Sequence, residues 1–242
     1  MEKSAIITGA SKRIGRAIAE YLAEEEWNVV VHFNESEKPA EELVIKLKSK
    51  FPNQTFGSIK SNLSNEKEVE MLIPNLVSEF GSFQLLVNNA SVFKPGYLKE
   101  TSSKLFNNQL NVNLKAPFIL MRDFANRCGK GNIINIVDTR ISKNISGFAA
   151  YSLSKKGLWE LSKMAALEFA PKIRVNAIAP GVSLQPEERD ENYLEKLAEG
   201  IPMKKPGGIL PIIQSIGYIL ENDHLTGQLL FADGGENLGK ND

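Results

Sequence analysis

Two side chains four residues apart, Tyr151 and Lys155, have the types and the spacing for proton transfer. They stand at the start of a helical pattern over Ala150–Phe169, where residues four apart share one face. An ammonium group close to a phenol favours the phenolate and lowers the phenol pKa from about 10 toward the working range. Such a tyrosine can protonate a substrate oxygen as hydride arrives at the carbon. By itself, this pattern is better explained by a tyrosine and a lysine on the protein surface. Catalysis is favoured only because the pair follows an expected strand over Asn132–Val137 by one loop, in a nucleotide-binding pattern.

The nucleotide-binding pattern begins at a turn of small residues. The first expected strand, Ser4–Thr8, leads into Gly9-Ala10-Ser11-Lys12-Arg13-Ile14-Gly15 and then into a helix that reaches about Glu26. Such a turn lets backbone N–H groups approach a pyrophosphate, and the helix N-terminus adds a favourable partial charge. The glycines stand six apart, and Arg13 takes the place of the middle glycine of many such turns. The alternative is a plain strand-to-helix turn in which glycine supplies only backbone freedom.

The end of the second expected strand, Asn28–Phe33, indicates which cofactor is bound. An NAD site places an acid about 20 residues further on to accept from the ribose 2′-hydroxyl, but Phe33 or Asn34 stands there. Four nearby side chains could together hold a 2′-phosphate: Lys12, Arg13, His32 and Ser36. Glu35 would repel that phosphate if it faced inward, and we expect it to be a solvated loop carboxylate. The sequence therefore favours NADPH.

The elements that must position these residues alternate between apolar strands and helices, which is typical of a parallel sheet covered on both faces. The strand-like runs are Ser4–Thr8, Asn28–Phe33, Thr55–Ser61, Leu85–Asn88, Asn132–Val137, Ile173–Ala179 and Leu229–Ala232. The later helical patterns are Ala40–Lys50, Glu66–Phe80, Ser103–Arg127 and Ala150–Phe169. We expect residues 1–242 to form a single doubly wound α/β (Rossmann) domain, with a parallel sheet of about seven strands and helices on both faces. The segment Pro180–Lys205 breaks the alternation, and we expect a substrate loop or lid at about 181–205.

The composition disfavours several classes of function. The chain of 242 residues carries 29 basic and 29 acidic side chains, which argues against a nucleic-acid-binding protein. A single cysteine, Cys128, rules out an intramolecular disulfide, and two histidines, His32 and His224, leave little for a metal site. The first residues lack the apolar core of a signal peptide, and the apolar stretch Ile209–Leu220, which contains Pro211, is too short to span a membrane. We expect a soluble cytoplasmic protein with no metal, nucleic-acid or membrane partner.

Six motifs spread over nearly the whole chain together resemble the short-chain dehydrogenase/reductase family. They are Thr8–Gly15, Asn88-Asn89-Ala90, Asn113 within Val-Asn-Leu, Tyr151-x-x-x-Lys155, Pro180-Gly181 and Asp233-Gly234-Gly235. The resemblance implies that Tyr151 is the proton donor, and that Lys155 holds the nicotinamide ribose and lowers the pKa of Tyr151. It also implies that Asn113 holds a water in a proton relay and that the protein is a homotetramer.

One departure from the family pattern bears on the substrate. The family usually has Asn-Ile-Ser-Ser after the fifth strand, with the second serine catalytic, whereas this chain reads Asn135-Ile136-Val137-Asp138. A carboxyl group there can accept hydrogen bonds from an amino-substituted heterocycle or pass a proton to it, and a hydroxyl does either less well. The alternatives are that Asp138 disables the site or merely caps a turn.

Three further departures accompany Asp138: Arg13 in the glycine turn, Ser91 after Asn89-Ala90, and Phe93 two residues later. This set resembles the pteridine reductases and the bacterial dihydromonapterin reductases. By that resemblance Phe93 stacks on a pterin ring over the nicotinamide, Ser91 and Arg13 reach the ring or the cofactor phosphates, and Asp138 serves proton delivery. The other interpretation of Phe93 is an ordinary core aromatic.

These inferences define an expected site. The catalytic residues are Asp138, Tyr151, Lys155 and Asn113, and the substrate contacts are Arg13, Ser91, Phe93, Asp138 and Tyr151. The residues expected to bind the cofactor are Gly9, Ser11, Lys12, Arg13, Ile14, His32, Phe33, Asn34, Ser36, Asn62, Leu63, Asn89, Ala90, Ser91, Asn113, Tyr151, Lys155, Pro180, Gly181 and Ser183. Among them Asn62 stands where an aspartate commonly contacts adenine.

The expected function is that of an NADPH-dependent reductase that transfers hydride to a pterin-type substrate. One alternative is a carbonyl reductase for another substrate, such as a 3-oxoacyl thioester or a ketone. Another is a nucleotide-binding regulator that has lost turnover. A hydrolase is disfavoured, because the chain has no Gly-x-Ser-x-Gly elbow and neither histidine is placed for a triad.

Overall fold

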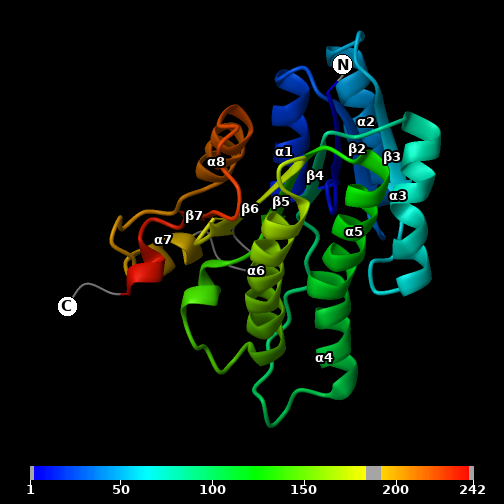
Figure 1. Cartoon of the computed structure of the whole chain (residues 1–242). Coiled ribbons are helices and arrows are strands. Elements are labelled where there is room, and N and C mark those ends of the chain that lie inside the picture. The colour runs from blue at the N-terminus through cyan, green and yellow to red at the C-terminus, as the bar shows by residue number, and fades with distance from the viewer. Residues whose placement is uncertain (1–2, 184–191, 240–242) are drawn as a thin grey trace.

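A single parallel sheet organises the chain (Figure 1). The computed structural model describes residues 3–183 and 192–239. Its strands are β1 (Ser4–Ile7), β2 (Asn28–Phe33), β3 (Phe56–Lys60), β4 (Leu85–Asn88), β5 (Gly131–Ile136), β6 (Ile173–Pro180) and β7 (Leu229–Ala232). Neighbouring strands pair in parallel in the order β3-β2-β1-β4-β5-β6-β7. The expected doubly wound α/β fold is confirmed.

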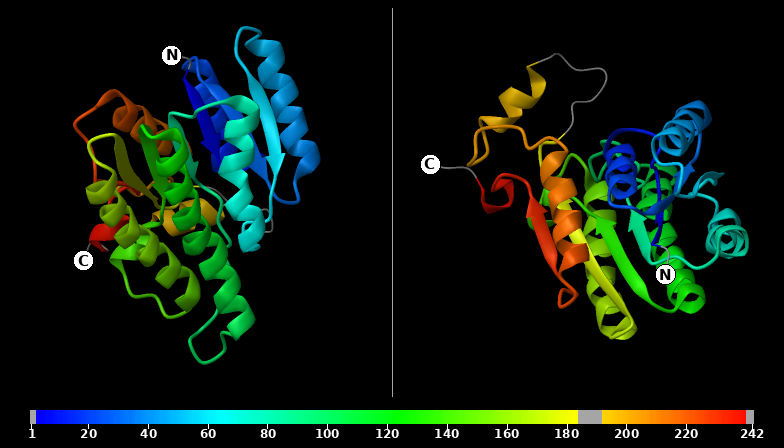
Figure 2. Two further views of the ribbon diagram at one scale, coloured as in Figure 1. Left: turned by 45° about the vertical axis from the view of Figure 1, so that its right-hand side comes forward. Right: turned by 90° about the horizontal axis from the view of Figure 1, so that it is seen from above.

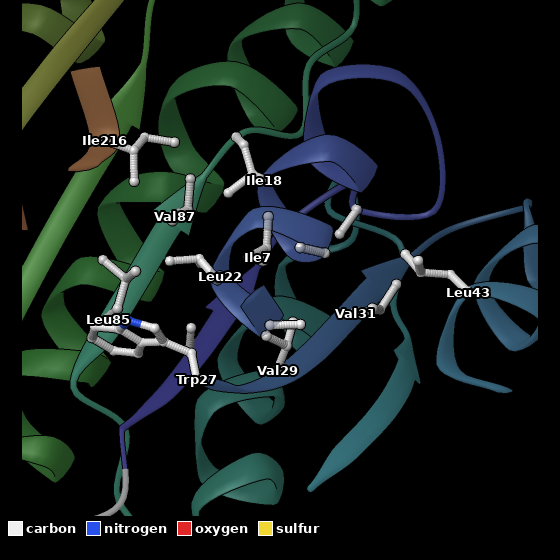
Figure 3. Close-up of a cluster of buried hydrophobic side chains, with 14 of the residues drawn as sticks. Ile7, Ile18, Leu22, Trp27, Val29, Val31, Leu43, Leu85, Val87 and Ile216 are labelled. Atoms are coloured by element: carbon white, nitrogen blue, oxygen red, sulfur yellow. The ribbon is translucent and has the colours of Figure 1, made fainter. Parts of the chain in front are cut away.

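Helices cover both faces of this sheet (Figure 2). They are α1 (Arg13–Glu24), α2 (Glu37–Lys50), α3 (Glu66–Phe80), α4 (Ser103–Leu110), α5 (Ala116–Cys128), α6 (Ala149–Phe169), α7 (Tyr193–Ala198) and α8 (Leu210–Glu221). Successive side chains of a strand point to opposite faces. Ile7 of β1 therefore belongs to a core with α1, α2 and α8, and Ile6 to a core with α3, α5 and α6. Figure 3 shows the first core, in which Ile18, Leu22 and Ile216 lie over the strands.

Helix α8 is an element that the sequence pattern did not predict. The apolar stretch Ile209–Leu220 was interpreted only as too short for a membrane span, yet it forms most of this helix. Pro211 lies in the first turn, where a missing N–H leaves no helical hydrogen bond unmade. Three of its isoleucines, Ile212, Ile216 and Ile219, are buried at helical spacing against the sheet.

The expected single helix over 103–127 is in fact divided. A π-helical turn, Asn111–Lys115, separates α4 from α5. Pro117 has no N–H to donate to the carbonyl of Asn113, four residues earlier, so the α-helical ladder is interrupted here. The Asn113 side chain, in the middle of this turn, is buried in the protein interior.

The order of the strands predicts where a ligand binds. β1 pairs with β2 on one side and with β4 on the other. The strand order therefore runs outward in one direction from β1 to β3 and in the opposite direction from β4 to β7, and it reverses between β1 and β4. Ligands of open α/β sheets bind beyond the carboxyl ends of the strands at such a point. The glycine turn follows β1, Asn89 and Ser91 follow β4, and Asp138 follows β5, all at this edge.

The expected substrate loop at about 181–205 is described only in part. It contains α7, while residues 184–191 lie outside the described residues. Whether the segment acts as a lid stays a prediction. Among the helices of residues 3–183 and 192–239, none combines the length and the apolar character needed to cross a membrane.

Candidate active site

Two adjoining cavities lie at the carboxyl edge of the sheet. The larger, of about 1110 Å³, is lined by residues that include Phe93, Asp138, Tyr151 and Lys155, and by α7. The smaller, of about 450 Å³, is formed by the glycine turn and the ends of β2, β3 and β4. Four residues line both cavities: Arg13, Ile14, Asn89 and Ser91. The expected substrate contacts and the expected nucleotide contacts are therefore neighbours in space.

Tyr151 and Asp138 form the centre of the larger cavity. The Tyr151 hydroxyl donates a 2.8 Å hydrogen bond to Oδ2 of Asp138. The other carboxylate oxygen, Oδ1, accepts the backbone N–H of Arg140 at 2.8 Å, so Asp138 also caps the short 3₁₀ helix Thr139–Ser142. The capping role foreseen as an alternative is present, and it coexists with the contact to the tyrosine.

The effect of Lys155 on Tyr151 differs from the expectation. The Lys155 ammonium donates to the carbonyl of Ile136 at 2.8 Å and lies 6.0 Å from the centre of the Tyr151 ring. The pKa of Tyr151 is raised well above its ordinary value, first by burial and then by the Asp138 carboxylate. The cation that opposes this rise is Arg140, not Lys155. Burial lowers the pKa of Lys155 itself to about 8, an effect that Asp138 opposes.

The buried Asn113 side chain forms a network of hydrogen bonds with the segment after β4 and with α6. Its Nδ2 donates to the carbonyl of Val92 at 2.9 Å and to Oγ of Ser154 at 3.0 Å. Its Oδ1 accepts from the backbone N–H of Val92 at 2.8 Å and from the Ser91 hydroxyl at 3.2 Å. Both amide hydrogens are therefore engaged. Asn113 thus anchors the segment that carries Ser91 and Phe93, and its expected part in a water relay stays a prediction.

Phe93 belongs to a small aromatic stack. Its ring lies parallel to that of Phe148 with centres 4.6 Å apart, and it meets the Tyr151 ring edge-on at 4.7 Å. Despite these contacts Phe93 is 46% exposed and lines the larger cavity. It is therefore not an ordinary core aromatic, since much of the ring remains open to a ligand.

Two residues of this site were missed in the sequence. Arg140 bonds to Asp138 through Nη1 at 3.2 Å, and its guanidinium lies about 5 Å from the ring centres of Phe93 and Phe148. The available signals were local. Arg140 stands two residues after the unusual aspartate, and Phe148 directly precedes the helix that carries Tyr151.

The glycine turn fits a phosphate group. Gly9 has a φ of +62°, and a Cβ there would lie 3.0 Å from Cα of Ala90. A Cβ on Gly15 would collide with the carbonyl oxygen of Gly9. Both glycines thus permit the close approach of backbone that such a turn needs. Arg13 adopts a positive φ of 54° without being glycine, a strained conformation of the kind found at functional sites.

All of the expected cofactor residues except Asn113 line at least one of the two cavities, and Asn113 lines neither. The smaller cavity is lined by Gly9, Ser11, Lys12, Arg13, Ile14, His32, Phe33, Asn34, Ser36, Asn62, Leu63, Asn89, Ala90 and Ser91. Pro180, Gly181 and Ser183 line the larger one, beside Tyr151 and Lys155. The oxygen of the Asn62 side chain accepts from Ser64, so a contact with adenine would come from its amide nitrogen. Glu35 is exposed as expected, although it also lines the smaller cavity.

His32 is a correction to the expected phosphate-binding set. Its ring is buried, Nδ1 accepts the N–H of Gly9 at 3.0 Å, and Nε2 lies 3.0 Å from the carbonyl oxygen of Ser61. Burial lowers the pKa of His32 to about 4, and the bond to Ser61 opposes that effect. A neutral imidazole with both nitrogens engaged cannot supply charge to a 2′-phosphate. Its role is to hold the glycine turn against β2 and β3.

Within the described ranges, no group of three or more histidine, cysteine, aspartate or glutamate side chains is placed to hold a metal ion. Two ion pairs lie near the candidate site. Arg140 pairs with Asp138, and Lys143 pairs with Glu236 at 3.4 Å. The buried Asp233 accepts from the Thr139 hydroxyl at 2.6 Å and thereby ties the C-terminal segment to the end of β5.

The family model described as short chain dehydrogenase matches residues 3–192. The chain belongs to this family. Among its relatives, the 3-oxoacyl-[acyl-carrier-protein] reductase FabG of Staphylococcus epidermidis is 35% identical, with 97% of this chain and 99% of that protein covered. The similarity to this FabG protein thus extends over nearly the whole chain.

Solved structures add a second group of relatives. FolM alternative dihydrofolate reductase 1 from Brucella canis, complexed with NADP, is 31% identical and superposes with a TM-score of 0.91, covering 99% of this chain and 96% of that one. The FolM protein from Brucella suis, also with NADP, is 30% identical with a TM-score of 0.90, covering 98% and 96%. The proteins similar to this chain therefore include reductases named for two different substrates.

Proposed function

We propose that this short-chain dehydrogenase is an NADPH-dependent reductase of a pterin-type substrate. The observation that carries the proposal is the 2.8 Å hydrogen bond between Tyr151 and Asp138, at a position where the family usually has a serine. A carboxylate beside the proton donor suits a nitrogen heterocycle, which can donate hydrogen bonds to it and receive a proton. The exposed face of Phe93 beside this pair offers a flat ring a stacking surface.

Bound NADPH would supply the hydride. The glycine turn would hold the pyrophosphate, and Lys12, Arg13 and Ser36 are the side chains for the 2′-phosphate. Lys155, buried at the junction of sheet and cavity, would hold the nicotinamide ribose. The absence of an acid at Phe33 and Asn34 supports NADPH over NADH, as does the NADP bound by the FolM proteins.

The proton comes from Tyr151 in this proposal. Its raised pKa keeps the hydroxyl protonated at neutral pH, which is the state that a proton donor needs before reduction. As hydride reaches the C=N carbon, the hydroxyl hydrogen leaves its bond to Asp138 and protonates the nitrogen. Before reduction Asp138 accepts that hydrogen, and its carboxylate can also accept from the amino groups of the same ring.

A 3-oxoacyl thioester reductase is the second candidate. The identity of 35% to FabG over 97% of the chain favours it. Asp138 and Phe93 speak against it, because a thioester offers neither a donor to the carboxylate nor a flat ring to the phenylalanine. A regulator without turnover is disfavoured by the presence of Tyr151, Lys155 and Asn113 together.

A substrate panel separates these candidates. Oxidation of NADPH and of NADH is followed with dihydrobiopterin, dihydromonapterin, dihydrofolate and an acetoacetyl thioester. We expect turnover with NADPH and at least one dihydropterin. Efficient reduction of the thioester with no activity on any pterin would overturn the proposal in favour of the second candidate.

We also propose a homotetramer in the cytoplasm. Large apolar side chains are exposed on the outer sides of α5 and α6, namely Phe118, Leu153, Met164 and Leu167. Exposed apolar groups of this kind mark association surfaces. Light scattering coupled to gel filtration should give four times the chain mass of 26.8 kDa, and replacement of Leu167 by Glu should dissociate the assembly. A monomeric wild type would contradict this.

A further inference from the structure

Arg140 contacts both Asp138 and the aromatic stack of the larger cavity. Its backbone N–H bonds to one oxygen of Asp138 at 2.8 Å, and its Nη1 bonds to the other at 3.2 Å. Its guanidinium lies 5.0 Å from the ring centre of Phe93 and 5.1 Å from that of Phe148. One residue thus connects the carboxylate that faces Tyr151 with the aromatic stack.

The geometry of Asp138 depends on this arginine. The oxygen that accepts from Tyr151 is the same Oδ2 that accepts from Nη1 of Arg140. Asp138 is largely buried in the pair, with its side chain 14% exposed. A carboxylate in such a place needs a counter-charge, because an unpaired buried charge is expensive. Without Arg140 the unpaired carboxylate would be more stable in water than in the cavity. The Asp138 side chain would therefore turn toward water and away from Tyr151.

The position of Arg140 is held in spite of a cost. Its Nε is buried and makes no hydrogen bond to any described residue. An unsatisfied buried donor costs about 1–3 kcal/mol. A side chain placed only for stability would satisfy this donor or leave it in water, so the conformation is better explained by what the other guanidinium atoms hold.

We propose that Arg140 is a positioning residue, which fixes the Asp138 carboxylate against the Tyr151 hydroxyl and holds the Phe93–Phe148 stack beside it. The proton donor and the stacking surface then act as one preorganised unit. The same guanidinium charge opposes the rise in the pKa of Tyr151 that burial and Asp138 cause. The part of this inference that concerns stacking rests on the proposed pterin function. The part that concerns the proton donor Tyr151 does not depend on which substrate is reduced.

The test is a double-mutant cycle with Arg140→Met and Asp138→Asn. Methionine keeps an apolar stem of similar length and removes the charge. We expect Arg140→Met to lower kcat about 100-fold, the effect of a misplaced catalytic group, while the KM for NADPH stays unchanged. The double variant should be no slower than the slower single variant, because both changes disrupt one arrangement. Arg140→Lys keeps the charge without the planar fork and should recover part of kcat.

Lys143→Met is the matched control. It removes an equal charge from the same stretch of chain, but Lys143 pairs with Glu236 and not with Asp138. Its effect on kcat should multiply with that of Asp138→Asn. If the effects of Arg140→Met and Asp138→Asn also multiplied independently, the positioning role would be refuted.

A crystal structure of Arg140→Met provides a readout that does not depend on substrate. We expect Asp138 to leave the Tyr151 hydroxyl and the Phe93–Phe148 stack to open. Persistence of both contacts would overturn the inference about Arg140. If the wild type reduced only the thioester, the proposed pterin function would fail, and the cycle on that substrate would still decide the role of Arg140.

Discussion

The backbone N–H of Gly9 donates a 3.0 Å hydrogen bond to Nδ1 of His32. Since Nδ1 is the acceptor, the hydrogen of the neutral ring is on Nε2, which donates to the carbonyl of Ser61 at 3.0 Å. The imidazole thus joins the glycine turn to the residue after β3. A proton on Nδ1 would set two N–H groups against each other.

Acidification should therefore destabilise the fold through His32. The ordinary histidine pKa of about 6.5 applies to the unfolded chain, and burial lowers it to about 4 in the folded protein. Between these pH values the unfolded state binds more protons, so the free energy of unfolding falls as the pH drops. Once His32 is protonated in both states, its contribution has lowered the free energy of unfolding by about 3 kcal/mol.

Urea unfolding at a series of pH values checks this prediction. His32→Asn is the control, because its side-chain oxygen can still accept from Gly9 and does not titrate. The pH dependence in this range should be weaker in the variant than in the wild type. Equal slopes for the two proteins would contradict the assignment.

Arg13→Gly should separate stability from cofactor selection. Glycine adopts the positive φ of 54° without strain, so the free energy of unfolding should rise by up to about 1 kcal/mol. Loss of a charged contact to the 2′-phosphate should weaken NADPH binding by about 1.5–3 kcal/mol, while NADH binding changes little. Chemical denaturation and fluorescence titration with both cofactors measure these effects. If the wild type bound NADH more tightly than NADPH, the predicted preference for NADPH would be wrong, and Glu35 would be implicated in cofactor selection.

Tyr151→Phe should remove most turnover and leave cofactor binding nearly intact. The lost hydroxyl is the proton donor, and general acid–base catalysis contributes about 10²–10⁴-fold. Lys155→Ala should by contrast impair both binding and rate, because its ammonium group is buried against β5 and lines the cavity. Steady-state kinetics and NADPH titration distinguish the two. Wild-type activity of Tyr151→Phe on every substrate would remove the tyrosine from the mechanism.

Asp138→Ser restores the residue that is usual in the family. The variant loses the acceptor for Tyr151 and the partner of Arg140. We expect lower turnover of a dihydropterin, together with a gain of activity on an acetoacetyl thioester relative to the wild type. The ratio of kcat/KM for the two substrates is the quantity to compare. An unchanged ratio would show that Asp138 does not determine which substrate is reduced.

Phe93→Ala tests the stacking surface. Stacking holds substrate and transition state alike, so the KM for a dihydropterin should rise while kcat changes less. Loss of an aromatic pair costs about 0.5–1.5 kcal/mol beyond the lost contact area. Phe93→Leu keeps an apolar side chain without the ring and serves as the control. Wild-type KM in Phe93→Ala would exclude Phe93 from the binding of the ring.

Local patterns in the sequence were sufficient for most of the sheet. β2, β4 and β7 have the predicted bounds. β2 and β4 are buried inside the sheet, and such a strand is a continuous apolar run between turns. Helix α8 and the π-turn at Asn111–Lys115 were not predicted. A proline at each place indicates that a helix is interrupted. Only the packing shows that Pro211 begins a helix and that Pro117 lies where a helix is divided.

The sequence by itself determined which residues could do chemistry and which strands they follow. Their residue types and their spacing are properties of short stretches of chain, whereas the strand order that brings them to one edge of the sheet comes from the tertiary structure. The tertiary structure decided what each group does. His32 changed from a phosphate ligand to a buried tether, because its partners Gly9 and Ser61 come from the first turn and the third strand. The cation opposing the rise in the pKa of Tyr151 is Arg140 rather than Lys155. Electrostatic effects depend on distance and burial, which arise only when distant segments pack together.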